Sequence, residues 1–178
     1  KEVGTPEVFL QYKGLWDMQD IYETIADFLR ENKFKLRERQ QRHRSPSPFG
    51  VERLHILEGS REVEHYYKWV VTVTIETFDE HDVEVATKEG IKKRMTKGRM
   101  WLRVSGVVDM DFEGIYESKP FLAALRNFYH NYIVKKKIEG VWWDQLYYHI
   151  VLKLHAKIKE RLKMVSEGFE HRHFSGVH

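Results

Sequence analysis

The sequence contains no cysteine, and this absence excludes disulfide bridges, thiolate metal sites and cysteine nucleophiles. A chain without disulfides fits the reducing cytoplasm, and the first residues, KEVGTPEVFL, lack the apolar core of a secretory signal. We therefore expect a cytoplasmic protein. No apolar run approaches the roughly 20 residues that a membrane-spanning helix needs, so the sequence predicts no membrane span.

The common catalytic and cofactor motifs are also absent. The sequence contains no G-x-S-x-G nucleophile elbow, no phosphate-binding P-loop and no G-x-G-x-x-G dinucleotide fingerprint. His130, His149 and His155 do not have the H-E-x-x-H spacing of zinc proteases, and we interpret them as packing residues. The sequence therefore predicts no catalytic residue and no cofactor, and it favours a non-catalytic protein.

Two acidic features have some resemblance to metal sites. Asp109, Asp111 and Glu113 project from one face of a predicted strand, roughly 7 Å apart along the chain. His81 lies within the acidic stretch DEHD. Because alternation predicts polar residues on a solvated strand face and aspartates are common in turns, we interpret these residues as surface groups and predict no metal site.

The composition is typical of a folded domain. Of the 178 residues, 42% are hydrophobic and 13% are aromatic, which is enough apolar side chain for one sizeable core. We expect a single domain over residues 1–165 and a flexible tail over residues 166–178. The formal net charge of +3 neither requires nor excludes an anionic partner. Lysine and glutamate are abundant while asparagine and glutamine are sparse, a balance typical of thermophilic proteins.

The stretch RMWLRVSGVVDMDFE, residues 99–113, shows the clearest pattern in the chain. Side chains alternate between the two faces of a strand, and here the odd-numbered face is mostly polar. The even-numbered face is almost purely apolar and consists of Met100, Leu102, Val104, Gly106, Val108, Met110 and Phe112. A strand of this kind belongs to an antiparallel sheet that is covered on one side.

Two helical regions can provide that cover. Residues 18–32 have apolar side chains at helical spacing, and Asp17 precedes them as an N-cap. In the C-terminal part, a helix that follows Ser118 and a second helix from about Val141 are separated by a break at residues 135–140. Both regions are amphipathic, so each can bury one face against the sheet.

These elements predict the fold class. Strands are expected at residues 7–12, 35–44, 54–57, 64–76, 83–86, 91–95 and 99–113, with a loop at SPSPFG (45–50) and a turn at residues 88–90. We predict a single α+β domain: a mainly antiparallel twisted sheet of about five or six strands, covered on one face by an N-terminal helix and a long, broken C-terminal helical segment. The element order is β-α-β-β-β-β-β-α-α, in which residues 91–95 lead into the strand at 99–113 and are counted with it.

This order of elements resembles that of helix-grip (START-like) domains, in which a curved sheet grips a long C-terminal helix around an apolar cavity. The present chain departs from that pattern in its clear early helix and its broken last helix. The resemblance is one of topology. It implies a carrier of a small apolar ligand, which we keep as an alternative function because a fold alone does not define one.

Aromatic residues provide the strongest functional hint. Trp101 falls on the polar face of its strand, between Arg99 and Arg103, where alternation does not explain a tryptophan. Further along the chain, two adjacent aromatic pairs cannot share one helical face, because neighbouring residues of a helix point about 100° apart. We therefore expect part of this aromatic surface to contact a protein partner or a second copy of the chain. The contact candidates are Trp101, Trp142, Trp143, Tyr147 and Tyr148.

A basic segment supports a third hypothesis. Residues 92–103 interleave cations with Trp101, an arrangement that can bind a phosphate backbone and stack on a base. The nucleic-acid candidates are Lys92, Lys93, Arg94, Lys97, Arg99, Trp101 and Arg103. The leading hypothesis is a non-catalytic protein-binding or assembly module. A carrier of a small apolar ligand and an RNA- or DNA-binding protein are its two alternatives.

Overall fold

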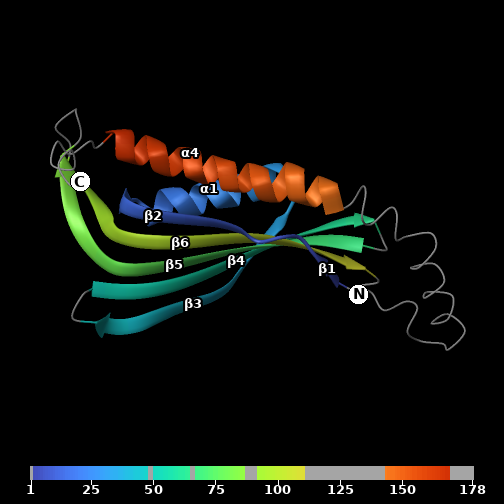
Figure 1. Ribbon diagram of the computed structural model, residues 1–178, viewed down its shortest axis with the longest axis horizontal. Helices are drawn as coiled ribbons and strands as arrows, with labels where there is room; N and C mark the ends of the chain where they lie inside the picture. The colour runs from blue at the N-terminus through green and yellow to red at the C-terminus, as the bar shows by residue number, and fades with distance from the viewer. Residues whose placement is uncertain (1, 48–49, 65–66, 87–91, 111–142, 169–178) are drawn as a thin grey trace, which may run out of the picture.

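The computed structural model describes residues 2–47, 50–64, 67–86, 92–110 and 143–168. Within them, six antiparallel strands form one curved sheet, and helices from both ends of the chain lie over its concave face (Figure 1). The fold class predicted from the sequence is confirmed. Several predictions lie outside the described residues: the helix after Ser118, the break at 135–140, the turn at 88–90, Trp142, Asp111, Glu113 and most of the tail.

The strands are β1 (Glu2–Gly4), β2 (Val8–Trp16), β3 (Lys35–Ser47), β4 (Gly50–Glu64), β5 (Tyr67–Ala86) and β6 (Lys92–Met110). The helices are α1 (Met18–Glu31), the π-helical segment η3 (Gln145–Val151) and α4 (Leu152–Gly168), which continues η3. The sheet order is β1-β6-β5-β4-β3, and β2 pairs with β6 beside β1. No helix of the described residues is long and apolar enough to cross a membrane.

Helix α1 begins where its sequence predicts. The side chain of Asp17 accepts hydrogen bonds from the backbone N–H groups of Gln19 and Asp20, so it satisfies donors that lack a partner within the helix. Ile21 and Ile25 on the inner stripe are almost completely buried. The helix ends one residue before the predicted boundary, a difference that is within the usual uncertainty of helix ends.

Strands β5 and β6 are longer than the sequence predicts, because each continues through a bend. Gly98 of β6 lies so close to β5 that a Cβ built on it would be 2.7 Å from the carbonyl oxygen of Phe78 and 3.0 Å from Cη2 of Trp16. The opposing strand shifts register between Phe78 and His81, and Asp79 adopts a left-handed φ of 55°. This irregularity joins segments that the sequence divides into separate strands.

The alternation of β6 continues through the bend. Met100 and every even-numbered residue to Met110 are buried, as the alternation predicts. The pairing of β6 with β2 has no irregularity from Thr96 to Val104, so the odd-numbered Met95 lies on the opposite face from Met100. There Met95 packs with Leu15 and Val85 in a small cluster separate from the main core.

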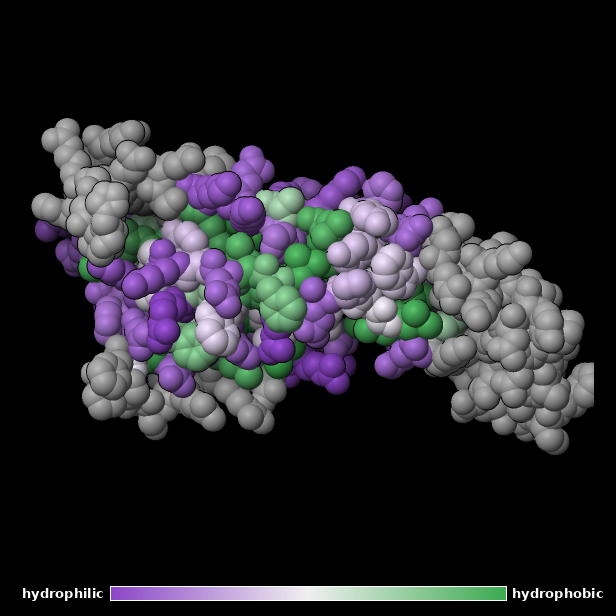
Figure 2. Space-filling model, viewed as in Figure 1, coloured by the Kyte–Doolittle hydropathy of each residue, from purple (hydrophilic) through white to green (hydrophobic). Residues whose placement is uncertain are grey.

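The main core lies between the concave face and the helices. Leu146 of η3 and Leu154 and Ile158 of α4 are at most 1% exposed. Gly106 of β6 allows η3 to approach closely, because a Cβ there would lie 3.0 Å from Leu146. In the view of Figure 2, apolar side chains gather between α4 and the strands, while polar side chains cover the outer surfaces.

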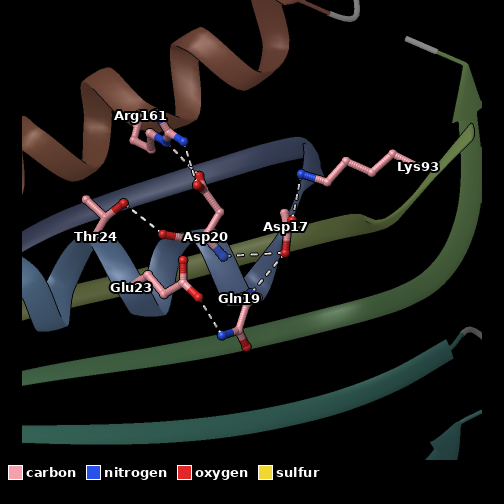
Figure 3. A network of polar contacts seen from close by, with 7 residues as sticks. All are labelled: Asp17, Gln19, Asp20, Glu23, Thr24, Lys93 and Arg161. Carbon is pink, nitrogen blue, oxygen red and sulfur yellow. Dashed lines mark hydrogen bonds and ion pairs between the residues drawn. The ribbon is translucent and has the colours of Figure 1, made fainter. Parts of the chain in front are cut away.

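A network of polar contacts connects α1 to α4 and to the end of β6 (Figure 3). Asp20 binds the guanidinium of Arg161 through both carboxylate oxygens, one at 2.6 Å, and this bond raises the pKa of Arg161. Asp17 forms an ion pair of 2.8 Å with Lys93. Burial alone would raise the pKa of Asp17, but Lys93 and the backbone N–H bonds outweigh it and hold that pKa below its usual value.

Candidate functional site

The convex face of the sheet, which is the face turned away from the helices, carries two exposed aromatic side chains. Trp101 of β6 is 46% exposed and Phe9 of β2 is 61% exposed. The strand register pairs Gln11 with Trp101 and Phe9 with Arg103, so the two aromatic residues are diagonal neighbours on one face. Phe78 of β5 packs edge-to-face against Trp101, with ring centroids 5.1 Å apart.

Paired charges flank these aromatic residues. Arg99 Nε donates to Asp79 at 2.8 Å, and its guanidinium also lies 5.8 Å from the ring centre of Phe78. Arg103 donates to Glu76 at 3.1 Å. Both cations are held beside an aromatic ring by a carboxylate, so the surface combines hydrophobic area with fixed hydrogen-bonding groups.

The middle of the convex face carries mostly uncharged side chains on β5 and β6, and Glu58 of β4 lies on the same face. The register places further half-buried apolar side chains on the same face, separated by threonines and a serine. These apolar residues are Leu54, Ile56, Val70 and Val107. Beyond them, Lys68 and Asp109 form an ion pair of 3.3 Å. We call Phe9, Trp101, Phe78 and these four residues the convex patch.

The predicted nucleic-acid segment does not form a continuous basic track. Lys93 contacts Asp17 and Arg94 lies 3.3 Å from Asp82. Arg99 and Arg103 are also paired with carboxylates, as described above, and Lys92 and Lys97 are exposed. Alternation also divides the cations, because Lys92 and Arg94 lie on the opposite face of β6 from the other four. This arrangement favours a charge-balanced surface over a phosphate-binding one.

A second group of aromatic rings consists of Tyr147 and Tyr148 on η3 and Trp143 just before it. Trp143 stacks on Tyr147, and Tyr147 meets Tyr148 edge-to-face, with ring centroids 5.2 Å apart in both pairs. Trp143 Nε1 donates to the carbonyl oxygen of Gly4 at 3.1 Å, which fixes η3 beside β1. Tyr147 packs against the core, whereas Tyr148 is 54% exposed. The sequence predicts such a division between adjacent aromatic residues.

The structure also reveals a buried polar cluster on the concave face that sequence reasoning missed. His55 of β4 and Glu80 of β5 are 8% and 6% exposed. Arg53 Nε lies 3.2 Å from Glu80 Oε2, and Thr77 Oγ1 donates to the Arg53 carbonyl at 3.3 Å. The sequence assigns Glu80 to an acidic turn, but the register shift after Phe78 turns its side chain inward. Alternation alone could not have shown this.

Burial lowers the pKa of His55. The carboxylates of Glu38 and Glu80 act in the opposite direction, and the charge of Arg53 reinforces the effect of burial. Since the pKa of His55 lies below its usual value of 6.5, the imidazole is neutral near pH 7. Its Nε2 atom has no hydrogen-bond partner.

This pKa predicts a pH dependence of stability. Between the pKa of an unfolded histidine and that of folded His55, the unfolded chain binds more protons, so the free energy of unfolding falls as the pH drops below about 6.5. His55→Gln should therefore lose less stability than the wild type between about pH 7 and pH 5. Urea unfolding at several pH values measures this difference. Parallel pH profiles for the two proteins would contradict the assignment.

Within the described residues, no three histidine or acidic side chains lie close enough together to hold a metal ion. No protein-family model and no curated protein matches the sequence. The function therefore has to be argued from the convex patch, the η3 aromatic group and the buried polar cluster. The apolar-ligand carrier stays a prediction.

Proposed function

We propose that this chain is a non-catalytic assembly module that binds a protein partner through the convex patch. One observation carries the proposal: Phe9 and Trp101 are exposed side by side on a sheet face that no described residue covers. Large aromatic side chains dominate the energetics of protein interfaces, since each buries a large area with little loss of rotamer freedom.

The surroundings of these two residues support an interface. Arginine is enriched together with tryptophan among the residues that contribute most to binding, and Arg99 and Arg103 flank Trp101. Their ion pairs with Asp79 and Glu76 already fix the guanidinium groups in place. A partner that covers the patch would then lose little additional side-chain entropy on binding.

The aromatic group on η3 is a separate contact candidate. Tyr148 is exposed on the helical side. Trp143 and Tyr147 are half-buried: Trp143 connects the start of η3 to β1, and Tyr147 packs η3 against the core. π-Helical segments frequently occur at functional sites. We assign this group a supporting role, because one exposed ring gives less contact area than the convex patch.

Trp101→Ala should weaken assembly by about tenfold or more, because it removes the largest exposed ring at the centre of the interface. Size-exclusion chromatography with light scattering, together with a pull-down by the immobilised chain, measures assembly with a second copy or another protein. Tyr148→Ala is the comparison variant, since it removes a similarly exposed ring from the helical side, to which we assign only a supporting role, and it should weaken assembly less than Trp101→Ala. A strictly monomeric wild type that captures no protein would refute the proposal.

A further inference from the structure

Three buried polar atoms at one end of the concave face lack a hydrogen-bond partner. They are Nε2 of His55 and both carboxylate oxygens of Glu80. Both side chains are more than nine-tenths buried. An unsatisfied buried polar group is costly, and more so when it is charged, so native proteins rarely leave several of them together.

The ion pair with Arg53 does not satisfy Glu80. Arg53 Nε lies 3.2 Å from Glu80 Oε2, but its N–H is not aligned for a hydrogen bond with either oxygen. The two partners also differ in environment: the side chain of Arg53 is 40% exposed and that of Glu80 is 4% exposed. Arg53 can therefore turn into solvent at low cost, whereas the carboxylate cannot leave the protein interior.

The charges and polar atoms around His55 and Glu80 indicate which kind of ligand could pair with the unpartnered atoms. Among the side chains that the structure describes, two carboxylates (Glu38 and Glu80) and one guanidinium (Arg53) act on His55, so the net charge of these described groups is negative. The carboxylate oxygens of Glu80 accept hydrogen bonds, and Nε2 of His55 accepts one when the ring proton is on Nδ1. On the side of β5 and β6 the next residues in the register are apolar: Ile75 pairs with His55, and Met100 pairs with Thr77. On the side of β3, Gln41 pairs with His55.

We propose that this end of the concave face binds a small primary amine with a short apolar chain, and that its ammonium group replaces Arg53 as the partner of Glu80. An ammonium has three N–H donors and a positive charge, which match the unpartnered atoms and the net negative charge of the described groups. Its apolar chain would contact the apolar side chains beside His55. This site is independent of the convex patch, which lies on the opposite face.

Hexylamine is the probe, and hexanol and hexanoate are its neutral and anionic counterparts. Isothermal titration calorimetry with the full chain should show saturable binding of hexylamine alone. Glu80→Gln should weaken that binding roughly tenfold or more, because it removes the buried charge that holds the ammonium. Arg53→Ala should strengthen it several-fold, because the competing guanidinium is gone.

Arg39→Ala and Glu58→Gln are the matched controls. Arg39 and Glu58 form an ion pair of 3.0 Å between β3 and β4, outside the buried polar cluster. Their substitutions remove one positive and one negative charge, as the test variants do. Neither should change the affinity for hexylamine. If Glu80→Gln fails to fold, Arg53→Ala still decides the question. The proposal is overturned if neither the wild type nor Arg53→Ala binds hexylamine at concentrations up to about 10 mM, or if hexanol or hexanoate binds equally well. Buried water would then be the better account of the unpartnered atoms.

Discussion

Leu154→Ala should destabilise the protein by about 2–5 kcal/mol, the range for removing a buried leucine side chain and leaving a cavity. Leu154 is completely buried and lies in α4, between Leu146 and Ile158, which are also buried against the sheet. The sheet is long and curved, so the space left by the side chain cannot be filled by a small movement of one strand. We expect a loss near the upper end of the range.

Urea unfolding followed by circular dichroism measures this loss. Leu152→Ala is the control, because Leu152 is on the same helix and loses the same atoms, but is only half-buried. It should cost clearly less. Equal losses for the two variants would show that burial of the Leu154 side chain on the concave face does not determine the cost, since alanine itself favours a helix at least as well as leucine.

Gly98→Ala should have the second largest effect, about 1–3 kcal/mol and near the upper end of that range. The added Cβ would lie 2.7 Å from the Phe78 carbonyl oxygen and 3.1 Å from that of Asp79. Backbone atoms cannot move aside as a flexible side chain can, so the two strands would have to separate at the bend. The buried ring of Trp16, which touches the same position, would be displaced as well.

Gly4→Ala is the matched control for this substitution. Its nearest contact would be the Gly106 carbonyl oxygen at 4.0 Å, which is an ordinary van der Waals distance. Thermal unfolding measures the melting temperature of both variants. It compares Gly98, where the backbone of β5 leaves no room for a Cβ, with Gly4, where a Cβ fits. If Gly98→Ala unfolds at the wild-type temperature, the bend does not depend on glycine.

Regular patterns made much of the fold predictable. The alternation after Gly98 identified the buried face of β6, and Asp17 followed by an amphipathic stripe located α1, because both depend on local sequence alone. The bend was not predictable in this way. It depends on a register shift between two strands, and only the paired strands show that Glu80 turns inward while Asp79 stays beside Arg99.

The candidate sites follow the same rule. Trp101 could be identified as exposed, because a tryptophan on a polar strand face contradicts the alternation. Phe9 could not, since EVFLQY fits a strand in either orientation until its pairing with β6 is known. The sequence around His55 did not identify this residue either. Its Nε2 atom is unpartnered because His55 is buried between neighbouring strands, which only the folded sheet shows.

The pairing of β6 with both β1 and β2 limits when the protein can fold during its synthesis. Thr5 and Gly106 exchange two hydrogen bonds although they are 101 residues apart, and β2 pairs with the preceding half of β6. The N-terminal strands therefore cannot take their places until β6 has left the ribosome, whereas β5 and β6 are close together in the chain and can pair first. Until then, the aromatic side chains of β2 are exposed to whatever binds the nascent chain.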